Sequence, residues 1–147
     1  MYTYLPAGST DLIEKFVTSM MLDGKKHLAR MILQNCLEEL KSRGHKNPSD
    51  AFEAALRNIM PHVEVRPKRV GGAVYQIPME VNSKRQVSLA IRWVLAASRK
   101  KKGIPMFKRL AAEIHDALND QGEAFKKKED VRRMAEANKA FAHLARY

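Results

Sequence analysis

The sequence is poor in residues that form covalent cross-links or metal sites. Cys36 is the only cysteine among 147 residues, so no internal disulfide can form. It lies among Ile32, Leu33 and Leu37, which predicts a buried and unreactive thiol. The five histidines have no metal-ligand spacing with one another or with Cys36, and the HExxH motif is missing. We therefore expect no metal, no cofactor and no redox chemistry.

Long apolar runs are also lacking. No stretch approaches the roughly 20 apolar residues that span a bilayer. The first residues, MYTYLPAGSTD, have neither the basic flank nor the apolar stretch of a secretory signal. We expect no membrane partner and an intracellular or organellar location. A length of 147 residues with 45% hydrophobic content predicts one domain over residues 1–147, in which residues 1–10 form an extended segment.

Motifs for catalysis are missing as well. The run Asp23-Gly24-Lys25-Lys26 is superficially like a phosphate-binding loop, but Ser19 stands where that motif needs its first glycine. No serine or threonine follows the lysine. Glu113 and Asp116 lie one helical turn apart without a plausible nucleophile beside them in the sequence. We expect a protein that is not an enzyme.

Acidic residues are scarce relative to basic ones. The chain has 27 Lys+Arg against 16 Asp+Glu, which gives a formal net charge of +11 and a pI near 10.0. This balance places polyanions first among possible partners. The excess is uneven, because residues 1–50 hold 7 basic and 6 acidic side chains and residues 51–147 hold 20 and 10. The second part of the chain should therefore build most of the partner surface.

Apolar residues recur at helical spacing in six segments. Caps, glycines and prolines predict helices from Thr10–Asp11 to about Asp23-Gly24, from Lys25 to Ser42, from Asn47-Pro48 to Pro61, from Asn82–Ser83 to Lys100, from Pro105 to Leu118, and from Gly122 to about His143. One segment between the third and fourth helices has strand periodicity instead. The predicted class is mainly α, a six-helix domain with one projecting β-hairpin.

The hairpin is predicted in EVRPKRVGGAVYQIPM, residues 64–79. Tyr75, Ile77 and Met79 alternate as residues of a half-buried strand do. Gly71-Gly72 supplies a turn, because two glycines tolerate the positive φ angles of the favoured two-residue hairpin turns.

Three cations, Arg66, Lys68 and Arg69, crowd the approach to this turn. Pro67 and Pro78 each lack a backbone donor, which suits edge strands. The charges could simply deter edge-to-edge aggregation. Their density near the turn favours an arm that reaches a polyanion.

Further cations gather at the expected helix ends. These clusters are Lys25 and Lys26; Arg99, Lys100, Lys101 and Lys102 with Lys108 and Arg109; and Lys126, Lys127 and Lys128 with Arg132 and Arg133. Backbone N–H groups at a helix start favour phosphate, although an ordinary exposed helix start explains the first cluster equally well. Consecutive like charges repel one another, which favours a polyanion over a solvated surface for the second cluster.

Four blocks of sequence carry a resemblance to a known family. They are LDGKK at 22–26, EVRPKRVGGAVYQIPMEV at 64–81, AIRWVLAASRKK at 90–101 and KKKEDVRRMAEANKAFAHLARY at 126–147. In this order they closely resemble the seventh-protein family of the small ribosomal subunit, of bacterial or organellar type, from about Leu12 to Tyr147. The resemblance implies six helices with a β-ribbon between the third and fourth.

The family's role is implied for this chain by the same resemblance. It is a structural constituent that binds and organises the 3′ major (head) domain of small-subunit rRNA during assembly. The implied rRNA contacts are Lys25, Lys26, Arg66, Lys68, Arg69, Lys84, Arg85, Arg92, Arg99, Lys100, Lys101 and Lys102, to which the charge clusters add Lys108, Arg109, Lys126, Lys127 and Lys128. We expect recognition of a folded junction by shape, because RNA helices hide their base edges.

Other implied partners are neighbouring head and platform proteins and the exit-site tRNA and mRNA. The hairpin tip, Val70, Gly71, Gly72 and Ala73, and the C-terminal residues Arg132, Arg133, Asn138 and His143 would lie near the exit site.

Location and function each keep an alternative. Bacterial relatives begin with a strongly basic arm, whereas this sequence has no cation before Lys15, so we expect no RNA contact from such an arm. A short, trimmed form suits an organellar ribosome, which slightly favours the mitochondrial matrix over the bacterial cytoplasm. A DNA-architectural protein with a basic β-arm is the alternative function. Such proteins commonly act as small symmetric dimers, and cations scattered over several helix ends fit an irregular RNA junction better.

Overall fold

Polar caps determine where two of the helices begin. In the computed structural model, which describes residues 8–146, the Thr10 hydroxyl accepts the Ile13 N–H at 3.3 Å and opens α1 (Asp11–Met20). The Asn82 side-chain oxygen accepts the Arg85 N–H at 2.9 Å and opens α4 (Ser83–Lys100). Residues 1–7 of the expected extended segment lie outside the described residues.

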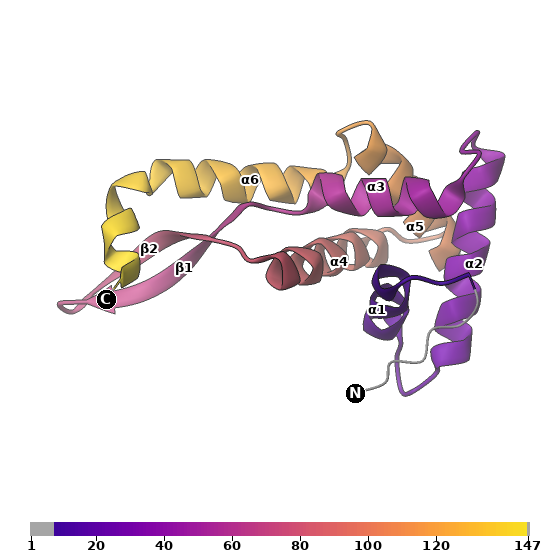
Figure 1. Ribbon diagram of the computed structural model, residues 1–147, viewed down its shortest axis with the longest axis horizontal. Helices are drawn as coiled ribbons and strands as arrows, with labels where there is room; N and C mark the ends of the chain where they lie inside the picture. Colours follow the sequence, from indigo (N-terminus) through magenta and orange to yellow (C-terminus); the bar gives the residue numbers. More distant parts are fainter. Residues whose placement is uncertain (1–7, 147) are drawn as a thin grey trace.

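A helical body carries a long hairpin at one end (Figure 1). The remaining elements are α2 (Lys26–Ser42), α3 (Pro48–Ile59), β1 (Val63–Val70), β2 (Ala73–Glu80), α5 (Met106–Leu118), α6 (Glu123–Ala137) and the 3₁₀ helix η1 (Lys139–Arg146). The predicted class, mainly α with one hairpin between α3 and α4, is confirmed.

The core lies where α5 packs against α2, α3 and α4. Phe16 and Phe52 meet edge to face, with ring centroids 4.9 Å apart, and join α1 to α3. Cys36 is fully buried, as the sequence predicts. Trp93 is partly buried and packs against the same cluster. This body fixes α4 beside α1 and leaves the hairpin to project.

The hairpin has the predicted turn and a simple register. Its pairs run from Val63 opposite Glu80 to Val70 opposite Ala73, and the turn glycines Gly71 and Gly72 have φ angles of 60° and 84°. Both values need left-handed backbone, which glycine adopts without a steric penalty.

Directly paired residues of an antiparallel ladder share one face. Glu64, Arg66 and Lys68 therefore lie on the same face as Met79, Ile77 and Tyr75. We call this the inner face, because Ile77 on it is buried and because α6 and η1 pack against the strands. Arg69 lies on the opposite, outer face.

The expected sixth helix is too long by about one and a half turns. The sequence predicts an end near His143, but α6 ends at Ala137 and the chain bends into η1 (Figure 1). The Asn138 side chain donates to the Met134 carbonyl at 2.8 Å and satisfies the end of the helix. The bend brings Phe141 to Tyr75, with ring centroids 5.1 Å apart, so packing against the hairpin accompanies the end of the helix.

Candidate nucleic-acid interface

Glu64 connects the base of the hairpin to α4. Its side chain is 11% exposed. Oε1 accepts from Arg66, with Nε at 2.9 Å and Nη2 at 2.7 Å, and Oε2 accepts from Arg85 Nε at 3.3 Å. Two expected rRNA contacts from different elements thus meet on one carboxylate, which the sequence analysis did not identify as important.

The other two hairpin cations lie in different surroundings. Lys68 donates to the Leu144 carbonyl of η1 at 2.9 Å, so its ammonium group is bound to the C-terminal segment. Arg69 is exposed on the outer face and has no acidic partner within residues 8–146. The three cations that the sequence groups together therefore divide between two faces.

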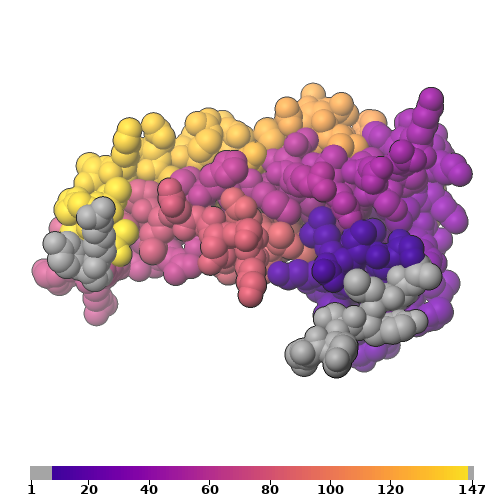
Figure 2. Space-filling view, in the orientation of Figure 1, coloured from indigo at the N-terminus to yellow at the C-terminus, as the bar shows by residue number. Residues whose placement is uncertain are grey.

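A basic surface runs along α4 beside α1. Lys84, Arg92 and Arg99 recur on one side of α4, and Lys15 of α1 lines the same hollow as Lys84, with a volume of about 350 Å³. We call these four residues the α1–α4 basic face. Figure 2 shows the α4 surface between the hairpin and α1.

A second hollow on this face has a volume of about 290 Å³. Its lining residues include Ser19, Ser88, Arg92 and Arg99, together with apolar residues of α4. Arg99 also donates to the Met20 carbonyl at 3.2 Å, which ties α4 to the end of α1. Cationic and hydroxyl side chains are the groups that bind phosphate and sugar oxygens.

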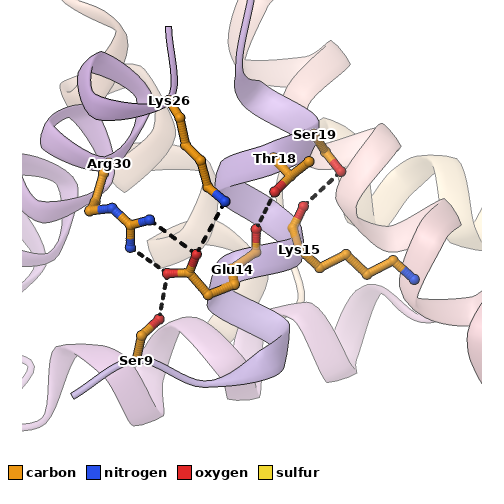
Figure 3. Close-up of polar contacts among 7 residues, drawn as sticks. All are labelled: Ser9, Glu14, Lys15, Thr18, Ser19, Lys26 and Arg30. Atoms are coloured by element: carbon orange, nitrogen blue, oxygen red, sulfur yellow. Dashed lines mark hydrogen bonds and ion pairs between the residues drawn. The ribbon is translucent and has the colours of Figure 1, made fainter. Parts of the chain in front are cut away.

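The neighbouring Glu14 holds other cations away from this face. It accepts hydrogen bonds from Arg30, one of them at 3.1 Å, and from Ser9 at 2.9 Å, whereas Lys15 points the other way (Figure 3). The Arg30 hydrogen bonds lower the pKa of the Glu14 carboxyl, and burial opposes them. Lys26 lies 3.9 Å from the same carboxylate, and its neighbour Lys25 is exposed.

The basic run between α4 and α5 divides into paired and unpaired cations. Lys100 donates to Glu123 at 3.1 Å, and Lys101 lies 3.2 Å from the buried Glu113. Arg109 donates to the Lys101 carbonyl at 2.6 Å. Lys102 and Lys108 are exposed without an acidic partner in the part of the chain that the structure describes, and they are the members best placed to meet a polyanion.

The cations of α6 divide in the same way. Lys128 donates to the Asn58 carbonyl at 2.8 Å, whereas Lys126 and Lys127 are exposed. Arg132 pairs with Glu129 at 3.0 Å, and Arg133 lies 3.9 Å from Asp130.

The residues expected near the exit site gather at one end of the molecule. The tip, Val70 to Ala73, projects there, and η1 returns the chain to the same end (Figure 1). Asn138 caps α6, and His143 Nδ1 lies 3.1 Å from the Ala140 carbonyl.

Chemistry of other kinds finds no site among the described residues. No group of three or more His, Cys, Asp or Glu side chains within residues 8–146 could hold a metal ion. Over the same residues, no helix has the length and apolar character required to cross a bilayer.

Comparison with known proteins agrees with the resemblance. The family described as "Ribosomal protein S7p/S5e" matches residues 3–139. The chain is 54% identical over 142 residues to the "Small ribosomal subunit protein uS7" of Rhodopirellula baltica, which covers 95% of this chain and 90% of that protein. It is 49% identical to the protein of that name from Dictyoglomus thermophilum, covering 94% and 88%.

A third relative of the same name, from Chloroflexus aurantiacus, is 53% identical over 92% of this chain and 86% of its own length. These relatives are bacterial and give no support to a mitochondrial preference. Members of the family are structural ribosomal proteins and not enzymes. The family match and these identities over nearly the whole chain show that this protein belongs to the small-subunit ribosomal protein family S7p/S5e.

Proposed function

We propose that this chain binds the 3′ major (head) domain of small-subunit rRNA as a single domain and organises it during assembly. The observation that carries the proposal is the α1–α4 basic face. Arg92 and Arg99 line one hollow between these helices, and Lys15 and Lys84 line another together with Asp11 and apolar side chains.

Unpaired cations are the best candidates for phosphate contacts. Lys25, Arg69, Lys84, Arg92 and Lys102 are exposed and have no acidic partner within residues 8–146. Each can release a counterion from the RNA without breaking an internal ion pair. Paired members of the expected set, such as Lys101, stabilise the fold through their ion pairs and are weaker candidates for phosphate contacts.

Shape recognition would add to charge neutralisation. The hairpin projects from the helical body (Figure 1). Arg69 lies on its outer face and Lys84 and Arg92 are exposed on α4, and cations spread over separate elements suit an irregular junction and not a straight duplex. Phosphate contacts would fix the position of the protein, and the junction would supply specificity.

The test compares equilibrium binding to a folded 3′ major-domain RNA junction with binding to a DNA duplex of similar charge, across a salt titration. We expect a strong RNA preference that persists at high salt. Equal affinities with equal salt slopes would remove the proposed function and favour the DNA-architectural alternative.

Matched variants locate the interface. Replacing Lys84 and Arg92 with alanine should weaken RNA binding and reduce the slope of log K against log salt by about two contacts. Replacing Lys41 and Lys46 removes the same charge from exposed positions near the end of α2. If this control loses as much affinity as the first variant, the α1–α4 basic face is not the interface.

We further propose that the tip and the C-terminal segment lie near the exit-site tRNA and mRNA, with neighbouring head and platform proteins as the other partners. The support is that both elements reach the same projecting end of the molecule (Figure 1). Replacing residues 70–73 by a tight turn should spare rRNA binding and disturb exit-site tRNA occupancy. If subunit assembly failed in this variant as severely as exit-site tRNA occupancy, the proposal would be contradicted.

A further inference from the structure

We propose that Glu64 is a positioning residue that holds Arg66 and Arg85 as one phosphate-binding pair at the base of the hairpin. The inference rests on the proposed function, because the phosphate would belong to the small-subunit rRNA. It assigns an acidic residue a favourable role in binding a polyanion.

The two guanidinium groups approach the carboxylate from different elements. Arg66 of β1 reaches Oε1 through Nε at 2.9 Å and Nη2 at 2.7 Å, and Arg85 of α4 reaches Oε2 through Nε at 3.3 Å. Each oxygen is therefore assigned to one arginine. Two adjacent cations would repel each other without an anion between them.

Most arginine donors remain available in this arrangement. A guanidinium has five N–H donors, and Arg85 uses only the one on Nε in its contact with Glu64. Both of its terminal nitrogens have no acceptor within residues 8–146. Arg66 and Arg85 stay 57% and 37% exposed, so the free donors can reach an external phosphate.

The carboxylate itself is turned away from the solvent. The Glu64 side chain is only 11% exposed, and both of its oxygens face guanidinium nitrogens. An approaching phosphate would meet arginine N–H groups before it met the acid. Ordering two flexible arginines before binding lowers the entropic cost of holding them against the RNA.

The surrounding backbone keeps the two arginines in register. Asn82 caps α4 by accepting the Arg85 N–H at 2.9 Å. The His62 carbonyl accepts the Val81 N–H at 3.0 Å and closes the base of the hairpin. The strand ladder, the Val81–His62 hydrogen bond and the Asn82 cap hold β1 and the start of α4 without the Glu64 carboxylate, so a substitution there can change the arginines without unfolding the hairpin.

The test asks whether removing the negative charge of Glu64 raises or lowers the affinity for RNA. Glu64→Gln and Glu80→Gln each remove one negative charge from the base of the hairpin, and Glu80 is exposed without a cationic partner among the side chains described in residues 8–145. Simple electrostatics predicts that both changes raise the affinity for RNA. Positioning predicts that E64Q lowers the affinity about fivefold, which corresponds to the loss of one typical hydrogen bond, whereas E80Q leaves it equal or higher.

Two further readouts separate positioning from general structural support. E64Q should reduce the salt slope by about one phosphate contact, with an unfolding midpoint that shows the chain folded at the assay temperature. In a background with Arg66 and Arg85 both replaced by alanine, E64Q should cause no loss of affinity, and the affinity should stay equal or rise as it does in E80Q. A loss that persists in that background would overturn the proposal, because Glu64 would then act through the hairpin as a whole.

An E64Q affinity equal to or above that of the wild type would also overturn it. This failure is distinct from failure of the proposed function. If the wild type bound the RNA junction and the DNA duplex equally, the ribosomal proposal would fail, and the contrast between E64Q and E80Q on either polyanion would still decide the role of Glu64.

Discussion

Lys101 Nζ lies 3.2 Å from Oε2 of Glu113, whose side chain is 1% exposed. The other oxygen, Oε1, accepts the N–H of Ala124 at 2.9 Å. A buried carboxylate therefore joins the end of α4 to the start of α6 through α5. One of four consecutive cations neutralises this acid, while its neighbour Lys102 is exposed.

Lys101→Ala should destabilise the fold by about 2 kcal/mol, because it leaves Glu113 buried without its cation. The Lys101 side chain is 34% exposed, so the loss should lie below that of a fully buried pair. Lys102→Ala is the control and should change stability by less than about 0.5 kcal/mol. Denaturant unfolding measures both, and equal midpoints would contradict the assignment.

Gly122→Ala should cost about 2 kcal/mol or more, because an alanine there needs strained backbone. Gly122 has a φ of 93°, and an added Cβ would lie 2.9 Å from Oε1 of Glu113. Gly103→Ala is a useful comparison, since its φ of 86° is similar but open space surrounds it. Thermal unfolding should show the larger loss at Gly122, and an equal loss would mean that only the backbone angle matters.

Glu14→Gln should flatten the dependence of stability on pH in acid. The pKa of Glu14 is lowered in the folded protein, chiefly by hydrogen bonds from Arg30, and is about 4.3 in the unfolded chain. Its contribution to stability is therefore complete above the unfolded pKa and is lost as pH falls through the folded pKa.

The measurement is the free energy of unfolding between neutral and strongly acid pH. Glu38→Gln is the control, because Glu38 is exposed and has no cationic partner among the described residues. If the unfolding free energy of the Glu14 variant falls at acid pH as much as that of the wild type, other carboxyl groups cause the loss of stability.

Cys36 should resist alkylation until the whole chain unfolds. Burial raises the pKa of its thiol to about 12, so almost no thiolate exists at neutral pH. Adding Gln34→Cys, an exposed position on the same helix, supplies a fast-reacting thiol in the same molecule. Labelling followed by mass spectrometry should give one fast and one slow site, and two fast sites would indicate local opening of α2.

Phe141→Ala should release η1 from the hairpin and leave the helical body intact. Its ring lies 5.1 Å from that of Tyr75, and the loss should be about 1 kcal/mol for an aromatic pair of this kind. Hydrogen exchange should increase in residues 139–146 and stay unchanged in α5. Unchanged exchange in η1 would mean that the Lys68 contact with Leu144 suffices to hold it.

Local chemistry made much of the fold predictable. The Asn82 cap, the Gly71-Gly72 turn and the helical spacing of apolar residues all act within a few residues of the structure they specify. The predicted end of α6 near His143 was wrong, because residues 123–143 all have the composition of a helix and no glycine or proline among them marks the end at Ala137. The bend after Asn138 is accompanied by packing of Phe141 on Tyr75, a contact between segments far apart in the sequence.

The candidate interface was predictable as a set of cations but not as a surface. Charge density identified Arg66, Lys68 and Lys101 equally, and no local rule distinguishes them. Their differences come from Glu64, Leu144 and Glu113, which the fold brings to them. Lys15 was overlooked because its position beside Lys84 depends on how α1 packs against α4.

The order of elements along the chain leaves the inner face of the hairpin uncovered during synthesis. β1 and β2 precede α6 and η1, the segments that pack on them. A chain that grows from its N-terminus therefore completes the strand pair before its cover exists. For that interval Ile77 and Tyr75 form an apolar stripe between open strand edges, the type of surface on which unfinished chains aggregate and which chaperones bind.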